Sequence, residues 1–140
     1  MSEAVSIEQS CSDLGALGQE LQQILNQEWS PVSPSYSPAT VGLSLVNQGD
    51  LAGGLIGELL LDWFYIKLLA VKPELQGQGF GRALVLRAEA LARDKKCTGV
   101  WVNTYSFQAP EFYTKLGFQE FGRLPNNPRG QDRVFLSKKF

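Results

Sequence analysis

Apolar residues recur at helical spacing in three stretches of the chain. In residues 12–28 leucine and isoleucine fall three or four positions apart, and in residues 82–95 Leu84, Ala88 and Leu91 form one stripe. A third stretch, 110–116, has Pro110 in its first turn and Gly117 just past its end, the usual order for a short helix. The pattern therefore predicts two amphipathic helices and one short helix.

Apolar runs without that spacing predict strands at residues 40–47, 51–61, 63–72, 99–105, 118–124 and 133–136. The tetrapeptide at 47–50 is typical of a hairpin turn, and the strands on either side of residue 62 are nearly continuously apolar, as in strands covered on both faces. A strand, a helix and a strand in that order imply a right-handed parallel crossover. We therefore expect a mixed α/β (α+β) sheet with antiparallel N-terminal strands, a central crossover and a C-terminal hairpin.

Length and charge narrow the class of protein. The 140 residues suffice for one core, and we expect a single domain over residues 1–140. Prolines in residues 30–38 predict a loop, which either connects two elements or forms a wall of a binding site. The formal charge of -1 does not favour nucleic acid or an anionic membrane as a partner. With no leader pattern and no bilayer-length apolar run, we expect a cytoplasmic protein.

The chain contains no histidine, which excludes Ser-His-Asp and Cys-His triads, a His general base and a HExxH zinc site. Cys11 and Cys97 lie far apart and form no CxxC pair, so we expect neither a metal site nor a redox motif. Any chemistry must therefore use tyrosine, lysine, carboxylates, backbone groups or the substrate itself.

A glycine-rich hexapeptide, Gln76-Gly77-Gln78-Gly79-Phe80-Gly81, stands between a predicted strand and a predicted helix. Such a helix N-terminus presents free N–H groups to an anion. A P-loop is excluded because Arg82-Ala83 follows Gly81 in place of Lys and Ser or Thr. The dinucleotide-binding pattern GxGxxG fits poorly, because Arg82 occupies the position of its third glycine. In addition, no carboxylate that could bind a ribose ends a following strand. What remains is the pattern [Gln/Arg]-x-x-Gly-x-[Gly/Ala], in which Gly77 is expected to matter less than Gly79 and Gly81.

That pattern, preceded by Val71-x-Pro73, resembles motif A of the GNAT superfamily of N-acetyltransferases. A second segment, NTYSFQAPEFYTKLGF at residues 103–118, looks like motif B of the same superfamily. The pattern Ala-x-x-Phe-Tyr-x-Lys-x-Gly-Phe is met by Ala109, Phe112, Tyr113, Lys115, Gly117 and Phe118. From about residue 53 to 140 the chain is similar to a small bacterial member; the first fifty residues match only in their helix-loop-strand order.

The resemblance implies an acetyl-CoA-dependent N-acetyltransferase, without a metal, that acts on a primary amine of a small molecule or peptide. Its parallel strands, around residues 69–71 and 100–103, would splay into a V; the pantetheine arm would pair with residues 69–71 and the diphosphate would meet the N–H groups of residues 76–82. Similar proteins are often dimers, which leaves a homodimer open. The implied cofactor-binding residues are Leu69, Ala70, Val71, Gln76, Gly77, Gln78, Gly79, Phe80, Gly81, Arg82, Asn103, Ser106, Ala109, Phe112, Tyr113 and Lys115.

The resemblance also implies that Tyr113 donates a proton to the departing thiolate. Many members carry a carboxylate at the positions of Tyr65 or Lys67, and residues 64–71 have none. Glu58 on the preceding strand is the candidate base, with Asp62 and Glu111 as alternatives. An acceptor amine of low pKa would need no base.

Other departures leave further alternatives open. Ser106 stands where the superfamily often has Asn, so that contact weakens or passes to Asn103, and Gln131 stands where related small members often have His. The aromatic side chains that either line an acceptor pocket or pack in the core are those of Tyr36, Trp63, Phe64 and Tyr65. Because the strand carboxylate is missing, a non-catalytic acyl-CoA-binding or sensing protein is the alternative.

Overall fold

The computed structural model describes residues 5–28 and 38–140, and the chain divides into two compact units, Met1–Tyr36 and Ser37–Phe140. Most of the proline-rich stretch, with Tyr36, lies outside the described residues. The first unit contains helix α1 (Leu14–Glu28), as the leucine spacing predicts. Its first turn is capped by Asp13, whose Oδ1 accepts a hydrogen bond from the Ala16 N–H at 3.4 Å. One domain over residues 1–140 stays a prediction.

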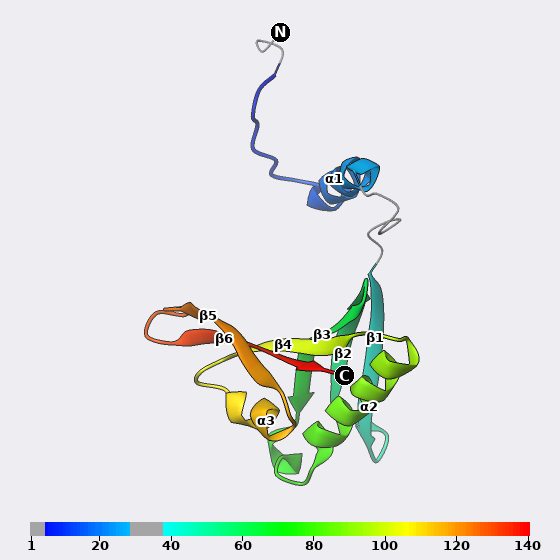
Figure 1. Cartoon of the computed structure of the whole chain (residues 1–140), viewed down its shortest axis with the longest axis vertical. Helices are drawn as coiled ribbons and strands as arrows, with labels where there is room; N and C mark the ends of the chain where they lie inside the picture. The colour runs from blue at the N-terminus through cyan, green and yellow to red at the C-terminus, as the bar shows by residue number, and fades with distance from the viewer. Residues whose placement is uncertain (1–4, 29–37) are drawn as a thin grey trace. The chain divides into compact units, whose positions relative to one another are not determined.

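The second unit is built on a mixed sheet (Figure 1). Its strands are β1 (Ala39–Asn47), β2 (Asp50–Leu60), β3 (Trp63–Val71), β4 (Gly99–Tyr105), β5 (Gln119–Pro125) and β6 (Asp132–Lys139), in the spatial order β1-β2-β3-β4-β6-β5. β3 and β4 run parallel, and the other neighbouring pairs are antiparallel. The expected mixed fold, with its central crossover and closing hairpin, is thus confirmed.

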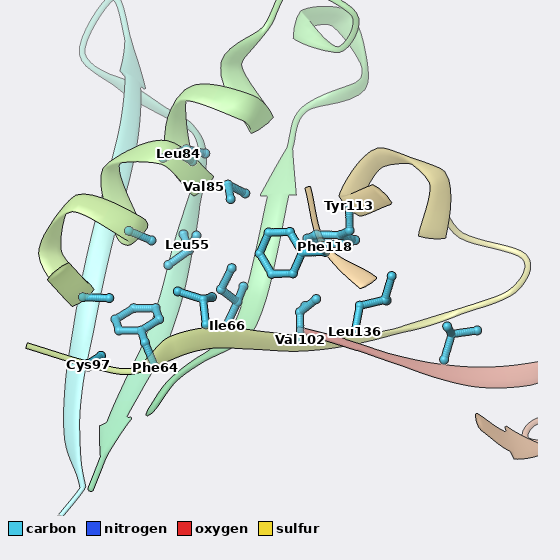
Figure 2. Packing of buried hydrophobic residues seen from close by; sticks show 14 residues of the cluster. Leu55, Phe64, Ile66, Leu84, Val85, Cys97, Val102, Tyr113, Phe118 and Leu136 are labelled. Atoms are coloured by element: carbon cyan, nitrogen blue, oxygen red, sulfur yellow. The ribbon is translucent and has the colours of Figure 1, made fainter. Parts of the chain in front are cut away.

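Helix α2 (Phe80–Asp94) lies across one face of the sheet, and the short helix α3 (Pro110–Lys115) follows β4 (Figure 1). Figure 2 shows the core between α2 and the sheet, where Val85 of α2 belongs to the same buried cluster as Phe64 and Ile66 of β3. Alternate residues of β3, β4 and β6 point into this core, so their neighbours in sequence face the opposite side of the sheet. The two faces of the sheet therefore carry different sets of side chains.

A buried ion pair ties α2, β6 and the end of α3 together. Glu89 of α2 is 4% exposed, and its Oε1 lies 2.9 Å from the Lys138 Nζ of β6. The same ammonium donates a hydrogen bond to the Leu116 carbonyl at 2.9 Å, directly after α3. The other carboxylate oxygen of Glu89 is buried without a hydrogen-bond partner in the described part of the chain. Lys138 is therefore the main compensation for the Glu89 charge.

Lys138→Met is expected to lower the free energy of unfolding by about 3–5 kcal/mol, because it leaves the Glu89 carboxylate buried without its cation. Urea denaturation followed by circular dichroism measures the loss. Lys139→Met removes the same charge from an exposed neighbour and should change stability by less than about 0.5 kcal/mol. The double variant Glu89→Leu with Lys138→Met should recover much of the loss; equal denaturation midpoints for the two single variants would contradict the assignment.

Candidate active site

The central feature of the site is the point at which two parallel strands separate. β3 and β4 are in register from Trp63 opposite Gly99 to Ile66 opposite Val102, and their pairing ends there. Beyond it, β3 stays paired with β2 as far as Val71, while β4 stays paired with β6. Residues 67–71 therefore present a backbone edge that β4 does not cover. The V-shaped opening implied by the resemblance is confirmed.

A β-bulge lies at the mouth of this V. Ile56 of β2 pairs with Leu68 and Gly57 pairs with Ile66, so Lys67 has no residue opposite it. The extra residue reverses the alternation of β3, so that Leu69 and not Leu68 packs against the core. After the bulge, the odd-numbered residues of β3 face the core, whereas before it the even-numbered residues do.

A cleft of about 990 Å³ follows the V. Of the predicted cofactor-binding residues, it is lined by Leu69, Ala70, Val71, Gln76, Gly77, Gly79, Phe80, Gly81, Arg82, Asn103, Ala109, Phe112 and Tyr113. It is also lined by Tyr65, one of the aromatic residues expected either in an acceptor pocket or in the core. Sequence reasoning did not assign the other lining residues to the site, namely Ile66, Lys67, Leu68, Leu75, Val102, Thr104, Tyr105, Gln108 and Arg133. The strand residues among them follow from the splay, which the sequence pattern does not locate, and Arg133 comes from a strand distant in sequence.

Several predicted residues do not line the cleft. Ser106 Oγ donates to Gln131 Oε1 at 2.7 Å and accepts from the Asp132 N–H at 2.9 Å, so it is engaged with the β5–β6 connection. Gln78 Nε2 donates to the Glu74 carbonyl at 3.4 Å, and Lys115 is exposed on α3. Ser106 and Gln78 are therefore hydrogen-bonded within the surrounding loops.

The glycine-rich hexapeptide forms the N-terminal approach to α2. Gly77 and Gly79 have φ of +79° and +89°, and apart from the adjoining residues of the chain no described atom lies within 4 Å of where a Cβ would stand on either. The backbone conformation at Gly77 therefore favours glycine as much as that at Gly79, and the lower importance of Gly77 for binding stays a prediction. Gly81 lies inside the first turn, where a Cβ would stand 3.3 Å from the Phe112 ring of α3. The loop thus has left-handed glycines, open space and the free N–H groups of a helix N-terminus.

Tyr113 reaches the cleft from α3. The residue is 8% exposed, and its ring is held by edge contacts with the rings of Phe112 and Phe118, whose centroids lie at 5.0 and 5.6 Å. Burial raises the pKa of Tyr113 to about 12. The hydroxyl is therefore a protonated hydrogen-bond donor throughout the physiological pH range.

The face of the sheet turned away from α2 carries a polar and aromatic network. Asn103 Nδ2 donates to the Tyr65 hydroxyl at 3.0 Å, and Asn103 Oδ1 accepts from Arg133 Nε at 2.9 Å. Glu58, the candidate base, does not line the cleft; it lies opposite Tyr65 on β2, and its carboxylate is 3.9 Å from the Lys67 ammonium. Glu58 is thus one residue removed from the cleft wall, on this second face.

Comparison with known proteins gives a consistent picture. The model of the "Acetyltransferase (GNAT) domain" matches residues 41–120. Blasticidin-S acetyltransferase of Streptomyces morookaense is 42% identical over 66% of this chain and 68% of its own length. Peptidyl-lysine N-acetyltransferase YjaB of Salmonella typhimurium is 37% identical over 59% of this chain and 54% of its own length.

Among solved structures, an acetyltransferase from Bacillus cereus superposes with a TM-score of 0.85 at 26% identity, over 99% of each chain. Within the described residues, none of the helices is long and apolar enough to cross a membrane.

Proposed function

The chain belongs to the GNAT family of acetyltransferases, which use acetyl-CoA, and we propose that it transfers the acetyl group to a primary amine of a small molecule or peptide. The observation that carries this proposal is the splay of β3 from β4 in line with the glycine loop. The exposed backbone edge of residues 67–71 suits an extended amide-bearing arm. The free N–H groups at the start of α2 suit a diphosphate.

Different residues around the cleft would bind different parts of acetyl-CoA. Leu69, Ala70 and Val71 would pair with the pantetheine amides, and Gln76 to Arg82 would bind the phosphates. Gln76 Nε2 donates to the Val71 carbonyl at 2.9 Å, which ties the loop to the end of β3. Because Gly77 and Gly79 have no Cβ, there is space for a phosphate oxygen to approach the backbone at both residues.

The reaction has two proton problems of unequal size. An alkyl ammonium of pKa about 10.4 costs about 4.6 kcal/mol to deprotonate at pH 7, whereas a thiol of pKa about 8.5 leaves readily. Tyr113, protonated in its buried position, is the proposed donor to the departing sulfur. Glu58 is the proposed base. It would act through water, because it does not line the cleft and its carboxylate lies 3.9 Å from the Lys67 ammonium.

Incubation with acetyl-CoA and a panel of amines, with free thiol detected colorimetrically, tests the proposal. Release of CoA that depends on the amine, with the acetylated amine found by mass spectrometry, is the expected result. Thermal stabilisation by acetyl-CoA with no thiol release across the panel would instead support the non-catalytic sensor. The same incubation without an amine measures background thioester hydrolysis.

A further inference from the structure

Arg133 is a cation in the cleft with no counter-ion in the part of the chain that the structure describes. It is half-buried and lines the cleft, yet it has no carboxylate partner among the described residues. Its neighbour Asp132 is bound to Arg123 at 3.0 Å instead. A guanidinium has five N–H donors in a planar fork suited to a carboxylate.

The position of that guanidinium is held by its neighbours. Nε is bound to Asn103, and the group lies over the rings of Tyr105 and Phe135, with its carbon 5.9 and 5.4 Å from their centroids. The Nε contact leaves four N–H donors with no hydrogen bond to any residue that the structure describes. A preorganised fork of this kind loses little conformational freedom when it binds an anion.

A second donor accompanies Arg133. The Tyr65 hydroxyl accepts the hydrogen bond from Asn103, which leaves its own hydrogen free to donate. Lys67 adds a further cation on this wall, although Glu58 partly offsets its charge. This wall of the cleft therefore presents donors and positive charge, on the side of the sheet away from α2.

An apolar hollow of about 570 Å³ adjoins these donors, lined by Trp63, Trp101, Phe121, Phe135 and Ser137. Two of its walls are shared with the donor network: Trp101 stacks on Tyr65 with centroids 4.1 Å apart, and Phe135 lies beneath Arg133. A molecule with an apolar body and an acidic group would contact both at once. The phosphate-binding loop lies on the α2 side, so the acidic group is assigned to the acceptor rather than to acetyl-CoA.

We propose that Arg133, assisted by the Tyr65 hydroxyl, binds a carboxylate of the acceptor, so that the preferred acceptors are small amines with a carboxylate and an apolar or aromatic body. This inference rests on the proposed N-acetyltransferase activity. It names the acceptor class for the same cleft, and it makes Arg133 a specificity-determining residue that acts through binding.

The test compares amines that differ only in acid or amide: phenylalanine with phenylalaninamide, tryptophan with tryptophanamide, and 4-(aminomethyl)benzoate with its amide. The wild-type protein should show at least a tenfold higher kcat/KM for the acid of a pair. Amides of α-amino acids have the less basic amine, so their intrinsic reactivity works against this result. Arg133→Met should lower kcat/KM for the acids on the order of 10- to 100-fold and for the amides less than threefold.

Arg129→Met is the matched control, since it removes an exposed arginine outside the cleft and should leave the preference intact. Arg133→Lys keeps the charge without the planar fork. Its kcat/KM for the acids should lie between the values for the wild type and Arg133→Met. Equal or better use of amides by the wild type overturns the inference while the acetyltransferase activity stands. A raised KM for acetyl-CoA in Arg133→Met, with acids and amides affected alike, assigns Arg133 to the cosubstrate and also overturns it. Failure of every amine to release CoA removes the proposed function and this inference together.

Discussion

Gly79→Asp is expected to abolish the thermal stabilisation that acetyl-CoA gives the protein. Gly79 precedes α2 with φ of +89°, and the space next to its missing Cβ is open. A carboxylate there would stand in front of the free N–H groups and repel the diphosphate. At 100 times its Kd a ligand stabilises a protein by about 2.7 kcal/mol, so the loss is measurable by differential scanning fluorimetry.

The left-handed backbone provides a control for this variant. Gly49, in the β1–β2 hairpin, has φ of +85° and equally open surroundings, but it does not line the cleft. Gly49→Asp should therefore lose a similar 1–3 kcal/mol or so of intrinsic stability and keep the full acetyl-CoA shift. A Gly79→Asp protein that acetyl-CoA stabilises as well as the wild type would remove the proposed phosphate site from this loop.

Tyr113→Phe is expected to lower turnover by roughly 10²-fold, the low end of the 10²–10⁴ range for a lost general acid. The buried hydroxyl has a pKa of about 12, against about 8.5 for a thiol. Full proton transfer to an ordinary thiolate would thus be about 4.8 kcal/mol uphill, so the hydroxyl contributes mainly a hydrogen bond to the developing charge. Steady-state kinetics with a saturating amine measures the change.

Phenylalanine preserves the ring packing of Tyr113 against Phe112 and Phe118, so acetyl-CoA binding should survive the substitution. The effect should fall on kcat, with little change in the KM for acetyl-CoA. Because the raised pKa keeps the hydroxyl protonated, wild-type turnover should show no loss from Tyr113 ionisation until the pH approaches about 12. Normal turnover in Tyr113→Phe would eliminate its role as donor.

The sequence predicted most elements closely, because their signals are local. The leucine stripes, the hairpin tetrapeptide and the Pro-to-Gly bracket of α3 each depend on neighbours a few residues away. Most boundaries shifted by one residue or a few, and two of these shifts have non-local reasons. α2 begins at Phe80 rather than Arg82, since Gly81 fits inside its first turn against Phe112. β6 runs to Lys139, beyond its apolar residues, because β4 supplies a pairing partner for each residue from Arg133 to Lys139.

By itself, the sequence determined the mixed fold, the glycine loop before α2, the motif tyrosine and the absence of histidine chemistry. These depend on residue type and short spacing, which the chain carries in any conformation. Only the tertiary structure decided that β3 and β4 part after Ile66 and that a bulge at Lys67 turns the strand there. It alone brought Arg133 beside Asn103, because long-range strand pairing places residues 30 apart in the chain within hydrogen-bond distance.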